Sequence, residues 1–109
     1  MVGLIAVTGA SGQVGRQVVA RLKAQCLPVR PIVRDPRRLP GDEQAVARQA
    51  SSYGAFDQMR TALHGAHTVF LIPAAEAADR VPQHRSAVDA ALSAGIERIV
   101  YLSFLGAAE

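Results

Sequence analysis

Three glycines spaced three residues apart are the residues of this chain whose type and spacing most clearly suggest chemistry. In VTGASGQVGRQVV, residues 7–19, Gly9 follows a β-branched apolar run and Gly15 opens a segment with helical periodicity. Gly9 can turn the chain off a strand, Gly12 has no Cβ and lets an anion approach the backbone, and Gly15 allows close helix packing. The N–H groups and the positive dipole end of that helix would hold the anion. The alternative is an ordinary tight turn that uses glycine for its own dihedral angles, and the surrounding elements decide between the two.

Short apolar runs alternate with helix-period segments around these glycines. A helix starting at Gln13 carries its apolar residues on one face, namely Val14, Val18, Val19 and Leu22. A second helical stripe, ended by Gly65, consists of Phe56, Met59 and Leu63. A third has Asp79 as N-cap, Pro82 in its first turn and Gly95 as its stop, and consists of Val81, Val88, Ala91 and Leu92. Strands are predicted over residues 3–9, 28–33, 44–49, 67–73 and 98–106.

This alternation predicts an α/β fold, and the continuous apolar runs predict that helices cover both faces of the sheet. We expect a Rossmann-type, doubly wound parallel sheet of five strands in the order 3-2-1-4-5, forming one domain over residues 1–109. Ligands of such sheets bind at the switch point outside the carboxyl ends of the strands. Because the glycines lie there, the setting favours a dinucleotide cradle over a simple turn. The expected cofactor contacts in this loop are Gly9, Ser11, Gly12, Gln13, Val14 and Gly15.

Charge and composition narrow the class of partner. The chain has 12 basic and 9 acidic residues, and the bases are concentrated in the N-terminal half, which suits a partner that carries phosphate. Without an aromatic platform beside the arginines, we expect no nucleic-acid role. No segment approaches the roughly 20 apolar residues of a membrane span, and the opening MVGLIAV lacks the basic region of a signal peptide. These features, together with the lone Cys26, predict a cytoplasmic protein.

The motif TGASGQVG resembles the fingerprint of the extended and atypical short-chain dehydrogenases/reductases. The stretches IVRDP, HTVFLIPA and RVPQHRSAVDAALSAGIERIVYLSFLGA look like the NmrA-like group. Within that group they look most like the NAD(P)H-dependent quinone oxidoreductases and their azoreductase-type relatives. Members of the group are much longer than this chain, so the resemblance implies that these residues form the N-terminal nucleotide-binding part.

The residues after the second strand predict which nucleotide binds. NAD enzymes favour an acid there that accepts the ribose 2′-hydroxyl, whereas NADP enzymes favour an arginine for the 2′-phosphate. In IVRDPRRL, Arg34 comes first and Asp35 second, while Arg37 and Arg38 add positive charge. A guanidinium matches a phosphate with two parallel hydrogen bonds, and the resemblance also implies that Arg34 reads the 2′-phosphate. We expect NADP (NADPH) rather than NAD, although Asp35 argues against a strict choice and RDPRR could also be a solvated loop.

The resemblance implies two more contacts with the cofactor. The family usually offers an aspartate near the adenine after the third strand, where this chain has Ser51 or Ser52. A serine can still bond the base, although more weakly. At the end of the fourth strand, Ile72 and Pro73 are expected as apolar contacts near the ribose next to the nicotinamide.

No catalytic residue is predicted. Typical short-chain dehydrogenases use Tyr-x-x-x-Lys, but Lys23 is the one lysine of the chain, and neither Tyr53 nor Tyr101 precedes it at that spacing. Ser103 matches a strand-end serine of the family and could touch substrate or cofactor, or simply bond the backbone. His84 lies on an apolar stripe, where a packed histidine explains it better than acid–base catalysis. Neither metal-ligand spacing nor a nucleophile motif is present.

Hydride transfer to a quinone-like or flavin-like acceptor needs no protein acid, because a nicotinamide held against the acceptor supplies the chemistry. We therefore expect the cofactor-binding part of an NADPH-dependent oxidoreductase with a quinone-like acceptor. Two alternatives stay open, a non-catalytic NAD(P) sensor such as the family's transcriptional co-regulators and a truncated domain with little activity. An exposed edge at the last strand predicts a homodimer or a tendency to aggregate if the chain stands alone. A monomer in sedimentation at high concentration would contradict that prediction.

Overall fold

The computed structural model describes residues 3–39, 41–44, 46–50, 55–72 and 80–101, and the side chains of all these except 42, 43 and 80–84. Within these ranges, five parallel strands form one sheet in the order β3-β2-β1-β4-β5. The strands are β1 (Ile5–Thr8), β2 (Val29–Val33), β3 (Arg48–Gln49), β4 (Thr68–Leu71) and β5 (Arg98–Tyr101). The predicted fold class and strand order are therefore confirmed. The predicted end of the last strand, residues 102–106, lies outside the described ranges.

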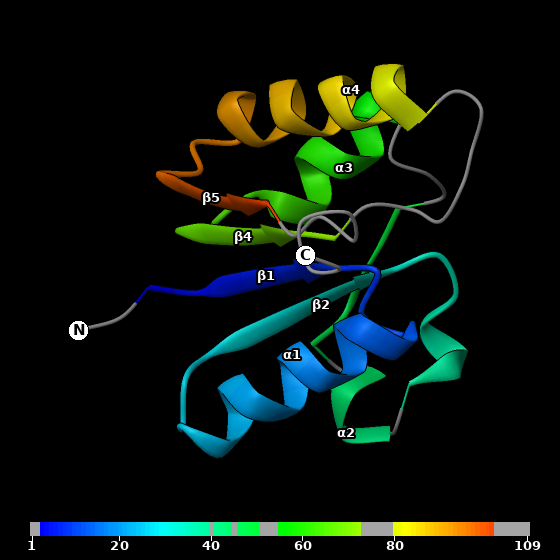
Figure 1. The fold of residues 1–109 in the computed structure, drawn as a ribbon, viewed down its shortest axis with the longest axis vertical. Coiled ribbons are helices and arrows are strands. Elements are labelled where there is room, and N and C mark those ends of the chain that lie inside the picture. Colours follow the sequence, from blue (N-terminus) through cyan, green and yellow to red (C-terminus); the bar gives the residue numbers. More distant parts are fainter. Residues whose placement is uncertain (1–2, 40, 45, 51–54, 73–79, 102–109) are drawn as a thin grey trace, which may run out of the picture.

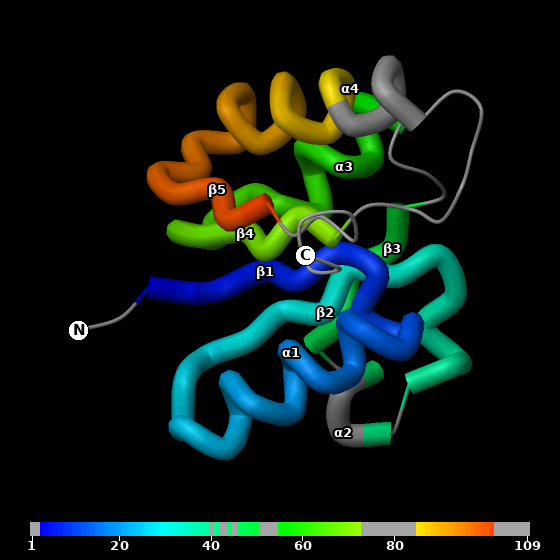
Figure 2. Tube along the Cα trace, in the orientation of Figure 1, coloured from blue at the N-terminus to red at the C-terminus, as the bar shows by residue number. Residues whose placement is uncertain are grey.

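Helices cover both faces of the sheet (Figure 1). On one face lies α1 (Gln13–Ala24), with α2 (Gly41–Gln44) beside it, and on the other lie α3 (Phe56–Leu63) and α4 (Arg80–Ser93). The tube in Figure 2 shows α1 running back along β1 and β2 before the chain enters β2. This crossover brings the start of α1 to the same edge as the carboxyl ends of β1 and β2.

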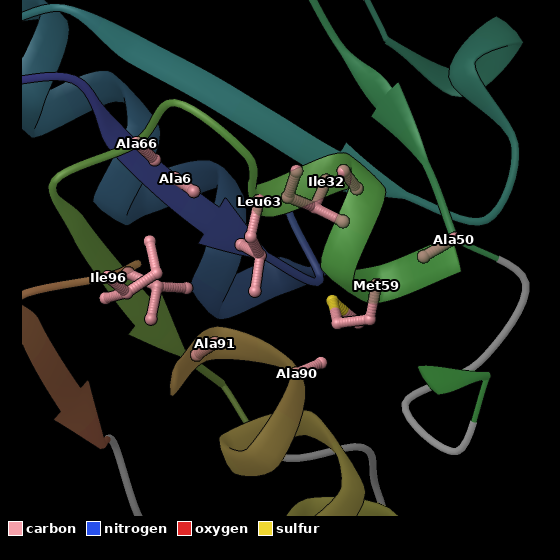
Figure 3. Packing of buried hydrophobic residues seen from close by; sticks show 11 residues of the cluster. Ala6, Ile32, Ala50, Met59, Leu63, Ala66, Ala90, Ala91 and Ile96 are labelled. Atoms are coloured by element: carbon pink, nitrogen blue, oxygen red, sulfur yellow. The ribbon is translucent and has the colours of Figure 1, made fainter. Parts of the chain in front are cut away.

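Apolar side chains fill the space on each side of the sheet. One cluster lies against α3 and α4 and includes Ala6 of β1 with Met59 and Leu63 of α3 (Figure 3). The other lies under α1 and includes Ile5 and Val7 of β1. Successive residues of β1 thus enter opposite clusters, and all four residues of the strand are buried. A strand covered on both faces needs a continuous apolar run, which is the pattern that predicted it.

The two helical stripes over this face are only partly as predicted. Leu92 was predicted to share an apolar stripe with Ala91, but it is 63% exposed, so its place on the packed face of the helix was wrong. The buried face of α4 is formed instead by alanines, namely Ala87, Ala90 and Ala91. Small side chains allow α4 to lie close to its neighbours, and the helix is rotated so that Leu92 points away from them. In α3, Phe56 is likewise 37% exposed, while Met59 and Leu63 are buried as predicted.

The region of the predicted third strand also differs. Residues 44–49 were expected to be extended, but the helix α2 occupies Gly41–Gln44 and β3 has only two residues. Both residues of β3 are exposed, so this strand has no apolar face whose burial would lengthen it. The side-chain amide of Gln44 donates to the Leu39 carbonyl at 2.8 Å, which ties α2 to the preceding turn.

Glycines end the helices where their positions predicted. Gly65 and Gly95 follow α3 and α4 with φ of 90° and 88°, in the left-handed region that glycine adopts without strain. Cys26, after α1, also has a positive φ, of 60°, and it is the non-glycine residue among those described that adopts this conformation. Pro31 of β2 lies opposite Val7 of β1. The carbonyls of Pro28 and Ile32 bond β1 and the loop after it, and because the bonding direction alternates along a strand, the nitrogen of Pro31 faces away from β1. β3 pairs with β2 only from Ile32 onward, so the missing N–H of Pro31 interrupts no ladder.

Candidate dinucleotide-binding site

The loop between β1 and α1 is a tightly held backbone turn. Gly9 has φ of 61°, so the chain leaves the strand through a conformation that favours glycine. The Gly12 N–H donates to the Gly9 carbonyl at 3.0 Å, which closes the turn. The Ala10 N–H donates to the Ile32 carbonyl at 3.3 Å, which ties the loop to the end of β2. The loop is thus fixed by backbone bonds.

Gly15 is required by packing within the protein. A Cβ at this position would collide with the Gly9 carbonyl group and would lie 2.8 Å from the Cα of Ala10. Gly15 is buried, and at this residue the first turn of α1 rests directly on the glycine loop. This is the close approach that the spacing predicted for the third glycine.

Gly12 is different, because a Cβ there would meet only the Gly9 carbonyl oxygen, at 3.4 Å. The residue is exposed and caps α1 with an extended backbone. The protein itself therefore tolerates a side chain at this position. The space that a side chain would take is the space from which an anion could reach the backbone, as expected for a phosphate cradle.

The start of α1 presents N–H groups beside this space that have no acceptor among the described residues. The first helical hydrogen bond runs from the Arg16 N–H to the Gly12 carbonyl at 2.9 Å, so the N–H groups of Gln13, Val14 and Gly15 have no acceptor within the helix. The N-cap residue has no side chain to satisfy them, and the first turn contains no acid. These groups and the positive end of the helix dipole can hold a pyrophosphate, so the predicted loop residues fit the ligand.

Thr8, the residue before the first glycine of the motif, links β4 to the glycine loop. Its side chain is fully buried at the end of β1. The hydroxyl donates to the Phe70 carbonyl at 3.2 Å and accepts from the Ile72 N–H at 2.9 Å. It therefore fixes the chain leaving β4 against the start of the glycine loop. A threonine ending an apolar strand just before the glycines was the available signal.

Ile72 lies at this carboxyl edge, but its side chain is only 5% exposed and belongs to the cluster under α1. Its side chain packs within the protein, so the apolar contact with the cofactor predicted for it stays a prediction. Pro73, the other residue predicted there, lies outside the described ranges.

Arg34 directly follows β2, and its side chain is exposed. Its carbonyl accepts a hydrogen bond from the side-chain amide of Gln49 at 2.9 Å, which positions its backbone between β2 and β3. Within the described residues, its guanidinium has neither a hydrogen bond nor an ion pair. An exposed arginine that has no partner among the described residues, at the end of the strand beside β1, is available to an anion.

The neighbouring acid is already engaged. The Asp35 carboxylate accepts from the Arg37 backbone N–H at 3.1 Å and caps the 3₁₀ turn η1 (Pro36–Arg38). It also pairs with the Arg37 guanidinium at 3.0 and 3.3 Å. These bonds to Arg37 lower the pKa of the Asp35 carboxyl. Asp35, the residue that favours NAD, is thus bonded to Arg37, whereas the side chain of Arg34, the residue that favours NADP, has no bond among the described residues.

Several residues considered as catalysts or contacts are not described. Ser51, Ser52, Tyr53 and Ser103 lie outside the described ranges, and His84 lies in α4 with its side chain undescribed. Lys23 lies in the last turn of α1. Tyr101 is the last residue of β5, the outermost strand on its side of the sheet, and is half exposed. In the part of the chain that is described, no three His, Cys, Asp or Glu residues are grouped as metal ligands would be, and no helix could span a bilayer.

Comparison with known proteins identifies the family. A profile of NAD(P)H-binding domains matches residues 9–109. Quinone oxidoreductase 2 of Escherichia coli K12 is 38% identical over 109 aligned residues, which cover 95% of this chain and 37% of that protein. A (4-alkanoyl-5-oxo-2,5-dihydrofuran-3-yl)methyl phosphate reductase of Streptomyces griseus is 36% identical over 106 residues, covering 97% of this chain and 36% of the reductase. Both relatives are reductases, and the chain spans little more than a third of their length.

Solved structures agree with this assignment. The crystal structure of the E. coli NADPH-dependent quinone oxidoreductase complexed with NADPH superposes with a TM-score of 0.77 at 36% identity, covering 89% of this chain and 35% of that one. Triphenylmethane reductase of Citrobacter sp., complexed with NADP(H), gives a TM-score of 0.79 at 30% identity, covering 89% of this chain and 36% of the reductase. The predicted NmrA-like, atypical short-chain dehydrogenase/reductase resemblance is confirmed. The chain belongs to this NAD(P)H-binding family and corresponds to the N-terminal third of its longer members.

Proposed function

We propose that this chain is the cofactor-binding part of an NADPH-dependent oxidoreductase that transfers hydride to a quinone-like acceptor. The observation that carries the proposal is the glycine loop packed under α1, with N–H groups at the helix start that have no acceptor among the described residues and Arg34 at the end of the adjacent strand. The relationship to a quinone oxidoreductase at 38% identity supports the acceptor class.

The choice of NADPH over NADH rests on Arg34 and Asp35. Recognition of the NAD ribose at this position calls for a carboxylate that can accept from the 2′-hydroxyl. The Asp35 carboxylate instead accepts hydrogen bonds from Arg37, whereas the exposed Arg34 guanidinium has no partner among the described residues. A guanidinium can bind the 2′-phosphate with two parallel, charge-assisted hydrogen bonds.

The described residues would bind and orient the cofactor. Gly12 leaves room for the pyrophosphate at the α1 N–H groups, and Thr8 holds the segment after β4 at a fixed distance from that loop. When bound, the nicotinamide supplies a hydride, and with one proton from solvent a quinone becomes a hydroquinone. No protein acid is needed for this reaction, which agrees with the absence of a Tyr-x-x-x-Lys sequence.

Calorimetric titration with NADPH and NADH tests the nucleotide assignment. Replacing Arg34 with Ala should weaken NADPH binding about 10- to 100-fold, since a hydrogen bond to a charged group contributes about 1.5–3 kcal/mol, and should change NADH binding less than about twofold. Arg98→Ala is the matched control, because Arg98 is an exposed arginine that begins a strand at the other edge. Equal losses for both nucleotides would refute the role of Arg34, and binding of neither nucleotide by the unaltered chain would refute the proposal.

Turnover separates the enzyme from the regulatory alternative. Oxidation of NADPH, followed by its absorbance with benzoquinone as acceptor, should occur if the chain can catalyse the reaction. Stoichiometric NADPH binding without oxidation would instead support a sensor of the NmrA type.

A further inference from the structure

Arg16 is a cation beside the glycine loop, in addition to Arg34, and has no role in the proposed function. It lies in the first turns of α1, with an exposed side chain. Its Nε donates to the Ser11 carbonyl at 3.0 Å, which folds the side chain back over the loop. Among the residues that the structure describes, its two terminal nitrogens have no hydrogen-bond or ion-pair partner.

The charge of Arg16 is poorly placed for the stability of α1. A cation near the start of a helix is repelled by the positive end of the helix dipole. No acid in the first turn compensates for it, whereas Arg21 and Lys23 lie in the last turn, where the dipole favours them. A positive charge that the helix does not favour, beside a cradle for phosphate, has a ready explanation in an anionic ligand.

The position of Ser11 shows which side of the loop Arg16 serves. The preceding residue, Ala10, is bonded to the Ile32 carbonyl, so this part of the loop lies against the end of β2. Arg34 follows two residues after Ile32 at that same end. With the pyrophosphate at the start of α1, the adenosine ribose of a dinucleotide lies toward this strand end. Arg16 is therefore anchored on the ribose side of the cradle.

We propose that Arg16 is a second recognition residue for the 2′-phosphate of NADPH, acting from α1 together with Arg34 from the end of β2. The Nε bond to Ser11 holds the guanidinium in place and leaves both terminal nitrogens to donate to phosphate oxygens. This inference rests on the proposed function, because it names a further residue of that same site. It adds a determinant from α1 to one that sequence reasoning placed only after β2.

The test compares Arg16→Met with Arg21→Met, which removes an exposed arginine from the far end of the same helix. Each variant is titrated with NADPH, NADH and adenosine 2′,5′-bisphosphate. Arg16→Met should weaken NADPH and the bisphosphate about 5- to 20-fold, in the range of one charge-assisted contact, and NADH less than about twofold. Arg21→Met should change none of the three. Arg16→Lys keeps the charge but loses the planar fork, so it should recover only part of the loss.

The outcomes separate this inference from the proposed function. Unchanged NADPH binding by Arg16→Met, or an equal loss for NADPH and NADH, overturns the role of Arg16 while leaving the dinucleotide site intact. Binding of neither nucleotide by the unaltered chain overturns the proposed function, and this inference with it. Denaturation midpoints that match the unaltered chain for both variants show that the fold is retained.

Discussion

The amino ends of the parallel strands form one edge of this sheet and their carboxyl ends form the other. Arginines at these amino and carboxyl edges are used in opposite ways. At the amino edge, Arg30 of β2 donates to the carbonyls of Ala62 and His64 at 3.0 and 2.6 Å, and so caps the end of α3. At the carboxyl edge of the same strand, Arg34 has no side-chain partner among the described residues. A structural arginine and one that is available to a ligand are thus four positions apart in the sequence.

Other polar groups at the amino edge are also satisfied by the protein. The His67 ring shares a hydrogen bond of 2.8 Å with the Thr68 hydroxyl and lies 3.8 Å from the Glu97 carboxylate. Its backbone carbonyl accepts from the N–H groups of Glu97 and Arg98 at 2.9 and 3.2 Å. At the carboxyl edge, by contrast, the first N–H groups of α1 have no acceptor within the helix. Among the described residues, the polar groups named at the amino edge are bonded within the protein, whereas the first N–H groups of α1 are left without an acceptor, as a ligand site requires.

The largest expected effect comes from disturbing the carboxyl edge where it does bear on stability. Gly15→Ala would drive a Cβ into the backbone of Gly9 and Ala10, which no side-chain rotation can relieve. We expect a loss of about 2–3 kcal/mol in the free energy of unfolding, at the upper end of overpacking costs, measured by urea denaturation. NADPH affinity should fall as well, because the loop must shift.

Gly41→Ala is the matched control, since a Cβ at Gly41 meets nothing within 4 Å. In a helix this change should be neutral or should stabilise by up to about 1 kcal/mol. If Gly15→Ala were as harmless as Gly41→Ala, the close packing of α1 on the loop would be disproved.

The next effect tests the two arginines of β2 directly. Arg30→Met removes the donor to two carbonyls at the end of α3, and we expect it to lower the free energy of unfolding by about 1–2 kcal/mol without changing NADPH affinity. Burial lowers the pKa of Arg30, and the charge of Arg48 lowers it further, but the guanidinium stays charged and donating at neutral pH. Arg34→Met should do the reverse, with unfolding changed by less than about 0.5 kcal/mol and NADPH affinity lost.

Arg98→Met controls for removal of an exposed arginine at the amino edge and should affect neither quantity. The contrast between the edges would fail if Arg30→Met weakened NADPH binding, or if Arg34→Met destabilised the fold as much as Arg30→Met does.

Much of the fold followed from patterns that burial imposes. Buried strands require continuous apolar runs, and the five predicted strands form the sheet in the predicted order. The pattern failed where burial is weak or small residues replace large ones. The alanine face of α4 carries little hydrophobic signal, so Leu92 was assigned to the packed face of the helix although it is exposed. The exposed two-residue β3 has no apolar alternation, so a helix and a strand were merged into one expected strand.

The candidate site divides along similar lines. Glycine spacing and Arg34 could be found from the sequence, because a bare backbone and a cation after a strand have characteristic chemistry. The two hydrogen bonds of the Thr8 hydroxyl cross the sheet to the end of β4, and the Arg16 side chain bends back to bond the Ser11 carbonyl. Residue spacing in the sequence does not predict either contact. The engagement of Asp35 by Arg37 likewise appears only in three dimensions.

The smallest expected effect concerns Asp35, the acid that follows Arg34 after β2. The pKa of Asp35 in the folded chain is lowered by its bonds to Arg37, so its contribution to stability is present above its ordinary pKa of about 4 and is lost as the pH falls through the lower folded value. Asp35→Asn should therefore lower the urea midpoint of unfolding slightly at pH 7. This difference from the unaltered chain should vanish under strongly acidic conditions.

Nucleotide titration of the same variant decides what the Asp35 carboxylate does when a ligand is present. If it remains with Arg37, as in the structure, Asp35→Asn should change NADH affinity less than about twofold, well below the loss expected when a ribose hydroxyl loses a charged acceptor. A selective, tenfold loss of NADH binding would mean that the carboxylate leaves Arg37 for the ribose. The carboxyl edge would then offer both an acid and arginines to the nucleotide, and its preference for NADPH would be relaxed.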